Sequence, residues 1–203
     1  MKRIVIILII IIFPLRVGAI SASSYIVMDT DNNRVLEGNN INKESLIASI
    51  TKILTSMVVI NNTNLDKKIT ISDSVLKSYG SGIYVSVGEE ITIRELLYGL
   101  MLRSGNDAAI ELAYQVASSP ENFSYLMNLL AKNIGMKHSN FVNSSGLEEK
   151  DSANTSTVYD MALLSSYAIK NPEYQKIVST KDITVKTNLK SYIWHNKNKL
   201  LTS

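Results

Sequence analysis

The chain has 203 residues, a formal net charge of +3 at neutral pH and no cysteine. This length is enough for one domain with a sizeable core. The small charge, without a basic cluster, gives no basis for nucleic-acid binding, and the lack of cysteine excludes a disulfide framework and a thiolate metal site. Only His138 and His195 are present, far apart in the sequence, so no metal site and no Ser-His-Asp triad is favoured.

The N-terminal segment has the pattern of a secretory signal peptide. Basic residues at positions 2 and 3 precede an apolar run at 4–13 that is too short to span a bilayer comfortably, and the small residues Ala19 and Ala22 follow it. We predict that 1–22 is a signal peptide, cleaved after one of these two alanines; the alternative is an uncleaved anchor. Either reading places the rest of the chain outside the cytoplasm, with membrane contact only through this segment.

The first half of the remaining chain alternates between strand and helix patterns. Two apolar runs, 25–28 and 34–37, flank a polar turn and predict a β-hairpin. Apolar residues at helical spacing predict a largely buried helix over 49–60, and an alternating run predicts a strand at 68–71.

A helical middle follows. Thr92 and Glu95 form a capping box that opens a helix to position 101, and a polar break at 103–107 leads into a second helix at 108–116. The pair Ser119-Pro120 begins a third helix, which Gly135 ends.

The last third of the chain returns to strands. A turn is predicted at 143–146, then a helix that begins at 157 and ends near Pro172, then two strands at 183–185 and 192–194. With no repeat or linker in between, we expect one α+β domain over 23–203, whose terminal strands pair in one antiparallel sheet.

The best candidate for chemistry is Ser49 with Lys52, at the start of the predicted buried helix. Residues three apart lie on one helix face, and a serine hydroxyl needs an adjacent base to act as a nucleophile. Burial lowers a lysine pKa and makes the neutral amine available as that base. The spacing alone is not specific, because Ser74 and Lys77 match it as well.

A second candidate lies in the polar break between two buried helices. There Ser104 could relay a proton between Lys52 and a leaving amine, and Asn106 could hydrogen-bond a substrate backbone amide. The triplet Ser104-Gly105-Asn106 consists of residue types that are also common in helix-loop-helix turns. The pattern is not specific, because Ser152-Ala153-Asn154 matches it equally well.

Taken together and in this order, the segments resemble serine-type D-Ala-D-Ala carboxypeptidases, the low-molecular-weight penicillin-binding proteins. The resemblance is carried by residues 48–55, 87–101, 104–109, 135–141, 146–147 and 156–162. It implies a β-lactamase/transpeptidase-like fold with a helical middle subdomain.

The resemblance also implies roles. Ser49 would be the acylated nucleophile, Lys52 its general base, Ser104 an aid to proton transfer and Asn106 a substrate-binding residue. The implied reaction removes the terminal D-alanine from peptidoglycan stem peptides through an acyl-enzyme, which β-lactams would trap. No metal or cofactor is implied, and the implied location is the cell wall or periplasmic space.

One element of the family pattern has no counterpart here. The family carries a Lys-Thr-Gly strand that binds the substrate carboxylate; Lys186-Thr187-Asn188 is similar but comes too early in the chain. The relatives also often have His where Asn154 stands. We therefore expect the domain to be incomplete at its C-terminus, with weak or no activity and low stability. Two other readings stay open: a non-catalytic homologue, and a serine β-lactamase, which usually has Ser-Asp-Asn at Ser104.

Overall fold

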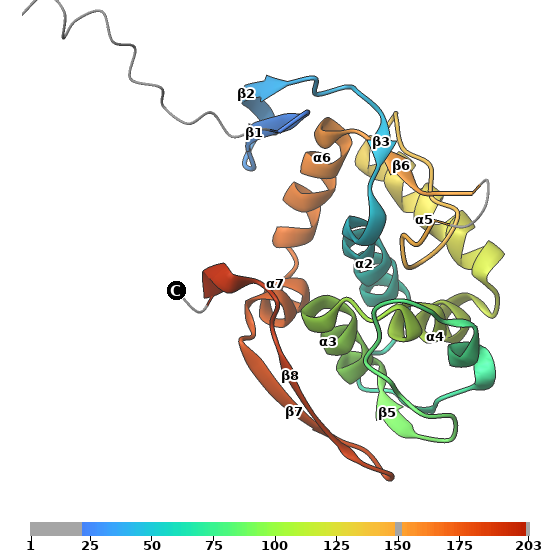
Figure 1. Ribbon diagram of the computed structural model, residues 1–203. Coiled ribbons are helices and arrows are strands. Elements are labelled where there is room, and N and C mark those ends of the chain that lie inside the picture. Colours follow the sequence, from blue (N-terminus) through green and yellow to red (C-terminus); the bar gives the residue numbers. More distant parts are fainter. Residues whose placement is uncertain (1–21, 149–151, 202–203) are drawn as a thin grey trace, which may run out of the picture.

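The computed structural model describes residues 22–148 and 152–201, and helices surround one central helix, α2 (Figure 1). The α-helices are α2 (Lys52–Asn62), α3 (Ile93–Arg103), α4 (Asn106–Ala117), α5 (Pro120–Ile134), α6 (Val158–Ile169) and α7 (Pro172–Ser179). The 3₁₀ helices are η1 (Ala48–Thr51), η2 (Asp73–Lys77) and η3 (Lys199–Leu201). The strands are β1 (Tyr25–Asp29), β2 (Arg34–Asn39), β3 (Ser45–Leu46), β4 (Lys68–Thr70), β5 (Glu90–Thr92), β6 (Thr155–Ser156), β7 (Asp182–Lys186) and β8 (Ser191–His195). The predicted signal peptide, except its last residue, lies outside the described residues.

The strands pair two by two, always antiparallel, as β1–β2, β3–β6, β4–β5 and β7–β8. The prediction that the terminal strands form one sheet is therefore wrong. The β1–β2 hairpin packs on α6, whereas β8 packs on α3, and the two hairpins lie at opposite ends of the helical body (Figure 1). Within the described residues no strand lies between them to join them into one sheet.

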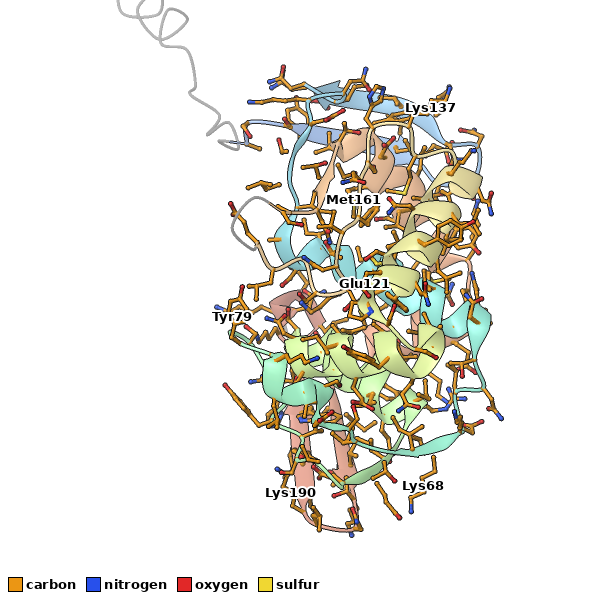
Figure 2. All side chains as sticks on the ribbon, turned by 90° about the vertical axis from the view of Figure 1, so that its right-hand side faces the viewer. Lys68, Tyr79, Glu121, Lys137, Met161 and Lys190 are labelled. Atoms are coloured by element: carbon orange, nitrogen blue, oxygen red, sulfur yellow. The ribbon has the colours of Figure 1, made fainter. Side chains whose placement is uncertain are left out.

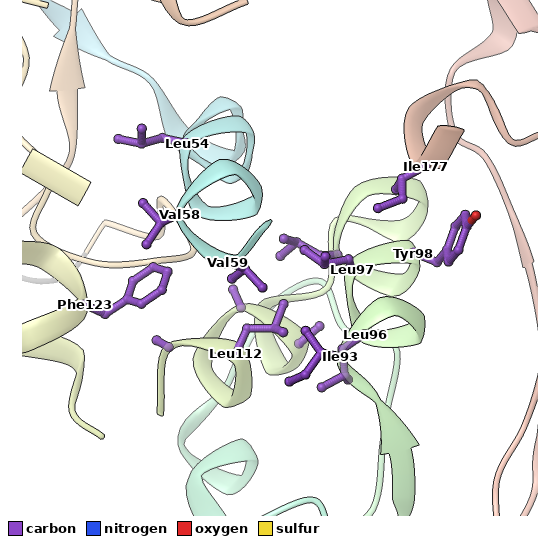
Figure 3. Close-up of a cluster of buried hydrophobic side chains, with 14 of the residues drawn as sticks. Leu54, Val58, Val59, Ile93, Leu96, Leu97, Tyr98, Leu112, Phe123 and Ile177 are labelled. Atoms are coloured by element: carbon purple, nitrogen blue, oxygen red, sulfur yellow. The ribbon is translucent and has the colours of Figure 1, made fainter. Parts of the chain in front are cut away.

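The core is built around α2, as its apolar spacing predicted. Leu54, Val58 and Val59 have no exposed surface. Figure 3 shows Val58 beside Phe123 of α5, and Val59 directed toward Leu97 of α3. Each such side chain contributes about 1.5–3 kcal/mol by leaving water, so this packing fixes the helix whose first residue is Lys52.

The predicted helix boundaries are confirmed where a local signal marks them. Thr92 and Glu95 form the capping box of α3, and Ser119 caps α5 through the N–H of Asn122. Gly135 ends α5 with φ of 96°. The second helix of the middle region begins at Asn106, two residues before the predicted start at 108.

One α-helix was not predicted. The helix that begins after Thr157 ends at Ile169, and Pro172 opens a further helix, α7. The Asn171 side chain caps α7 by accepting hydrogen bonds from two backbone N–H groups, and proline suits the first helical position because its missing N–H would be unpaired there. The predicted end of the preceding helix near Pro172 is confirmed, and the same proline also begins α7.

An apolar groove of about 830 Å³ runs between β1, β3 and the helices α6 and α7. Its wall includes Leu46, Ile50 and Ile169, which are 58%, 53% and 42% exposed, and Met161 of α6 (Figure 2). No helix among the described residues has both the length and the apolar character needed to cross a membrane.

Candidate active site

Ser49 lies in the 3₁₀ turn η1, immediately before α2, and Lys52 is the first residue of α2. The turn is sharp because Ala48 adopts φ of +45°, a left-handed conformation that costs a non-glycine residue about 1–3 kcal/mol. Ser49 is exposed as a result, whereas the Lys52 side chain enters the protein and is only 3% exposed. A hydroxyl open to solvent thus lies next to a buried amine.

The Lys52 amine has three polar neighbours. Its Nζ lies 3.2 Å from Ser49 Oγ, 2.8 Å from Asn106 Oδ1 and 2.6 Å from the Ser145 carbonyl oxygen. A neutral amine has two hydrogens and one lone pair. Asn106 and Ser145 offer only acceptor oxygens, so they take the hydrogens and leave the lone pair for the Ser49 hydroxyl.

The pKa of Lys52 is lowered from 10.5 to about 8, mainly by burial and in addition by the positive charge of Lys197, while Asp107 acts in the opposite direction. At pH 7.5 about a quarter of the lysine is then neutral, against about 0.1% at the ordinary lysine pKa. This difference of two orders of magnitude makes Lys52 a usable general base.

Asn106 lies at the start of α4 and is 4% exposed. Its Oδ1 accepts from Lys52, its Nδ2 donates to the Tyr79 carbonyl (2.7 Å), and its backbone N–H donates to the Ser81 carbonyl (2.7 Å). These contacts fix the orientation of the amide. Because an amide nitrogen carries two hydrogens, one N–H of Asn106 remains for a ligand carbonyl.

Ser104 ends α3 in a left-handed conformation, with φ of +62°, and is half-buried. Within the described residues its hydroxyl makes no hydrogen bond, so the structure does not join it to Lys52 or Ser49. Its place in the turn between α3 and α4, two residues before Asn106, leaves its role in proton transfer a prediction.

Asp107 is a buried residue next to Asn106, and the sequence analysis did not identify its structural role. Its carboxylate accepts hydrogen bonds from the backbone N–H groups of Ile83 (3.0 Å) and Tyr84 (2.6 Å). These bonds hold the loop at 79–84 against the start of α4. Figure 2 shows Tyr79 of this loop at the edge of the molecule. An acidic residue in the first turn of a helix was the available signal.

The second Ser-x-x-Lys match is not a site. The Ser74 hydroxyl donates to the buried Glu111 carboxylate (2.7 Å), whereas the exposed Lys77 lies 3.4 Å from the Tyr114 hydroxyl. The Lys-Thr-Asn sequence lies at the end of β7 and in the turn that leads to β8, where the Thr187 hydroxyl donates to Glu89 (2.6 Å).

Both histidines are exposed. His138 lies 3.5 Å from Glu44, and His195 pairs with Asp182. Over residues 22–148 and 152–201 no group of three or more His, Asp or Glu side chains is arranged to hold a metal ion.

Comparison with known proteins supports one family. A family model described as D-alanyl-D-alanine carboxypeptidase, peptidase family S11, matches residues 14–203. The D-alanyl-D-alanine carboxypeptidase DacF of Bacillus subtilis is 35% identical over 188 residues, which are 89% of this chain and 47% of that protein. The D-alanyl-D-alanine carboxypeptidase of Streptomyces sp. strain K15 is 39% identical over 173 residues, covering 76% of this chain and 59% of the relative.

Solved structures agree. A D-alanyl-D-alanine carboxypeptidase of Mycobacterium tuberculosis superposes with a TM-score of 0.85 at 27% identity, covering 89% of this chain and 68% of that one. The Streptomyces K15 DD-transpeptidase gives a TM-score of 0.80 at 34% identity, covering 89% and 74%. The chain belongs to the D-alanyl-D-alanine carboxypeptidase family and has the fold of its penicillin-binding proteins. It spans 47% and 59% of the length of these two curated relatives.

Proposed function

We propose that this chain carries the acylation centre of a serine-type D-Ala-D-Ala carboxypeptidase. The main support is the contact between the exposed Ser49 hydroxyl and the buried Lys52 amine, at 3.2 Å. The lowered pKa of Lys52 and the position of Asn106 on the same amine fit this chemistry.

In the proposed reaction the neutral Lys52 amine takes the proton of Ser49 Oγ as that oxygen attacks the carbonyl of the penultimate D-alanine. The tetrahedral intermediate collapses when the C–N bond breaks, and the departing amine receives a proton from the Lys52 ammonium, directly or through Ser104. Free D-alanine and an ester on Ser49 result. Water then cleaves the ester with the same base and returns the hydroxyl.

The proposed substrate is the stem peptide of peptidoglycan, and β-lactams would form a stable ester with Ser49. We further propose that the chain acts outside the cytoplasmic membrane, because residues 1–22 have the pattern of a signal peptide. The family membership supports a role at the cell wall.

A fluorescent penicillin tests the proposal. We expect durable covalent labelling of the wild-type protein and of the control Ser191→Ala, an exposed serine of β8, and no labelling of Ser49→Ala. Label that is soon released as hydrolysed drug would support a β-lactamase instead. A folded protein that takes no label would support the non-catalytic alternative and overturn the proposal.

Turnover is a separate measurement. The 203 residues contain no Lys-Thr-Gly sequence, and removing an oxyanion donor typically costs about 3–4 kcal/mol in the barrier. For a protein of these 203 residues alone we therefore expect D-alanine release from a pentapeptide to be slow even where Ser49 is acylated. Turnover at a rate typical of enzymes would contradict this expectation.

A further inference from the structure

Asn154 is a buried amide close to the site to which the proposed reaction assigns no role. It is 1% exposed and lies just before β6. Its Nδ2 donates to Thr51 Oγ1 and to the Asn143 carbonyl, both at 2.9 Å. Its Oδ1 accepts the backbone N–H groups of Val142 (2.7 Å) and Asn143 (3.2 Å). All the hydrogen-bonding positions of this one side chain are therefore used to join η1 to the 142–146 loop.

Backbone contacts hold the same region together. The Asn154 carbonyl accepts the N–H of Ile47 (3.3 Å), the residue just before η1. We call η1, the turn that presents Ser49, the nucleophile turn. A Cβ placed on Gly146 would lie 1.8 Å from the Ala48 carbonyl oxygen and 2.8 Å from Thr51 Oγ1. The loop thus lies directly against the turn that presents Ser49, with no room for a side chain between them.

The loop has one direct contact with the base. Asn143 Oδ1 accepts the N–H groups of Ser145 (3.2 Å) and Gly146 (2.7 Å), which shapes the turn so that the Ser145 carbonyl meets the Lys52 amine at 2.6 Å. Any movement of this loop away from η1 would take that carbonyl from Lys52 and open the amine to water.

We propose that Asn154 is the positioning residue of this centre. It holds the nucleophile turn and the Ser145 carbonyl in one rigid unit, and so directs the Lys52 lone pair at Ser49 and keeps the amine dry. The proposal rests on the proposed function for its effect on acylation, but its effect on Lys52 is independent of any reaction.

Asn128 provides a matched control. It lies on α5, and its side chain also bridges backbone, since Nδ2 donates to the Phe141 carbonyl (2.7 Å) and Oδ1 accepts the Phe141 N–H (3.0 Å). Unlike Asn154 it makes no hydrogen bond to η1 or to the 142–146 loop among the described contacts. Both asparagines can be replaced by alanine without changing the net charge, so a shift in the Lys52 pKa cannot come from a new charge.

The test is an NMR titration of the Lys52 side chain in the wild type, Asn154→Ala and Asn128→Ala, together with acylation by penicillin. We expect the Lys52 pKa to rise by about one unit or more in Asn154→Ala, because water enters the site, and to stay unchanged in Asn128→Ala. We expect the limiting acylation rate to fall about tenfold or more in Asn154→Ala alone, with a smaller change in the penicillin concentration that gives half of that rate.

The milder variant Thr51→Val keeps the Asn154 amide and removes one of its partners, so it should shift the same two quantities in the same direction by less. It also serves if Asn154→Ala does not fold. An unchanged Lys52 pKa in the folded Asn154 variant, or in Thr51→Val if the former is unfolded, would overturn the proposal. So would equal shifts in the two asparagine variants. A wild type that shows the titration but takes no penicillin would contradict the proposed function and leave the positioning role to be decided by the titration.

Discussion

The Lys52 pKa depends on the charges near it as well as on burial. Lys197 is exposed, and its backbone N–H donates to the Leu102 carbonyl at the end of α3. Its positive charge disfavours a second ammonium nearby, which lowers the Lys52 pKa. The Lys52 pKa is therefore lowered in part by a residue far away in sequence.

Removing that charge should raise the Lys52 pKa. In Lys197→Ala a smaller fraction of Lys52 is neutral at any pH below its pKa, so the acylation rate should fall there and recover at higher pH. The shift should be a few tenths of a pH unit at low salt and smaller at high salt, because the charge is screened. Lys186→Ala removes an exposed charge of β7 and should leave the pH profile unchanged; a profile equally unchanged in Lys197→Ala would contradict the account.

Gly146 is required for a different reason. Replacing it by alanine should displace η1, because the new Cβ would lie 1.8 Å from the Ala48 carbonyl oxygen. Gly88 also has a positive φ, +83°, but a Cβ there meets nothing within 4 Å. In Gly88→Ala we expect thermal unfolding to show a loss of about 1 kcal/mol of stability, with full penicillin labelling. In Gly146→Ala we expect a larger loss of stability and little labelling. Equal behaviour of the two variants would contradict the close approach.

At the scale of single residues the sequence predicted which side chains meet, but not all of their partners. Ser49 and Lys52 come together as the pattern indicated, whereas Lys52 also meets Asn106 directly and makes no hydrogen bond to Ser104 among the described contacts. The contact between the Ser145 carbonyl and Lys52 could not be predicted, because every residue has a backbone carbonyl and the residue type does not show where it points. Asn154 was named in the sequence only as a match to a triplet and as a departure from the His of the relatives, with no role assigned to it.

At the scale of elements, local signals were sufficient wherever hydrogen bonds close within a few residues. The capping box of α3 and the serine cap of α5 were readable because both partners lie within one turn. The predicted end of α6 near Pro172 is confirmed, but the cap that Asn171 provides for a further helix, α7, was not recognised.

The capping box supports a quantitative prediction. Thr92 Oγ1 accepts the N–H of Glu95, and its loss in Thr92→Ala should destabilise the protein by about 1 kcal/mol. For a chain of this size that corresponds to a fall in Tm of about 2–4 °C. Thermal unfolding measures it, and penicillin labelling should be retained because the cap lies at the far end of α3 from Ser104. An unchanged Tm would show that the cap is not needed.

At the scale of the whole molecule, strand pairing was the step that the sequence did not predict correctly. The strands of the β1–β2 and β7–β8 hairpins were predicted, since they are adjacent in sequence, whereas the β3–β6 and β4–β5 pairs were not. Which hairpins share a sheet depends on which helix each covers. The described strands form four separate pairs, and an apolar groove remains open beside β1, α6 and α7.

An open apolar groove should bind a hydrophobic dye. Ile169→Lys places a charge in the groove wall and should reduce the fluorescence of bound anilinonaphthalene sulfonate with a change in stability below about 0.5 kcal/mol. Tyr125→Lys changes an apolar surface residue of α5 that does not line the groove and should leave the fluorescence unchanged. Dye binding that neither substitution alters would place the dye elsewhere.

The most direct test of the acylation centre is the pH dependence of penicillin adduct formation at Ser49, followed by the mass of the peptide that contains it. The account predicts an adduct on Ser49 whose rate of formation rises with pH and is half-maximal near pH 8, the value set by the burial of Lys52. An adduct on another serine, or a rate on Ser49 that does not change between pH 7 and pH 9, would contradict it.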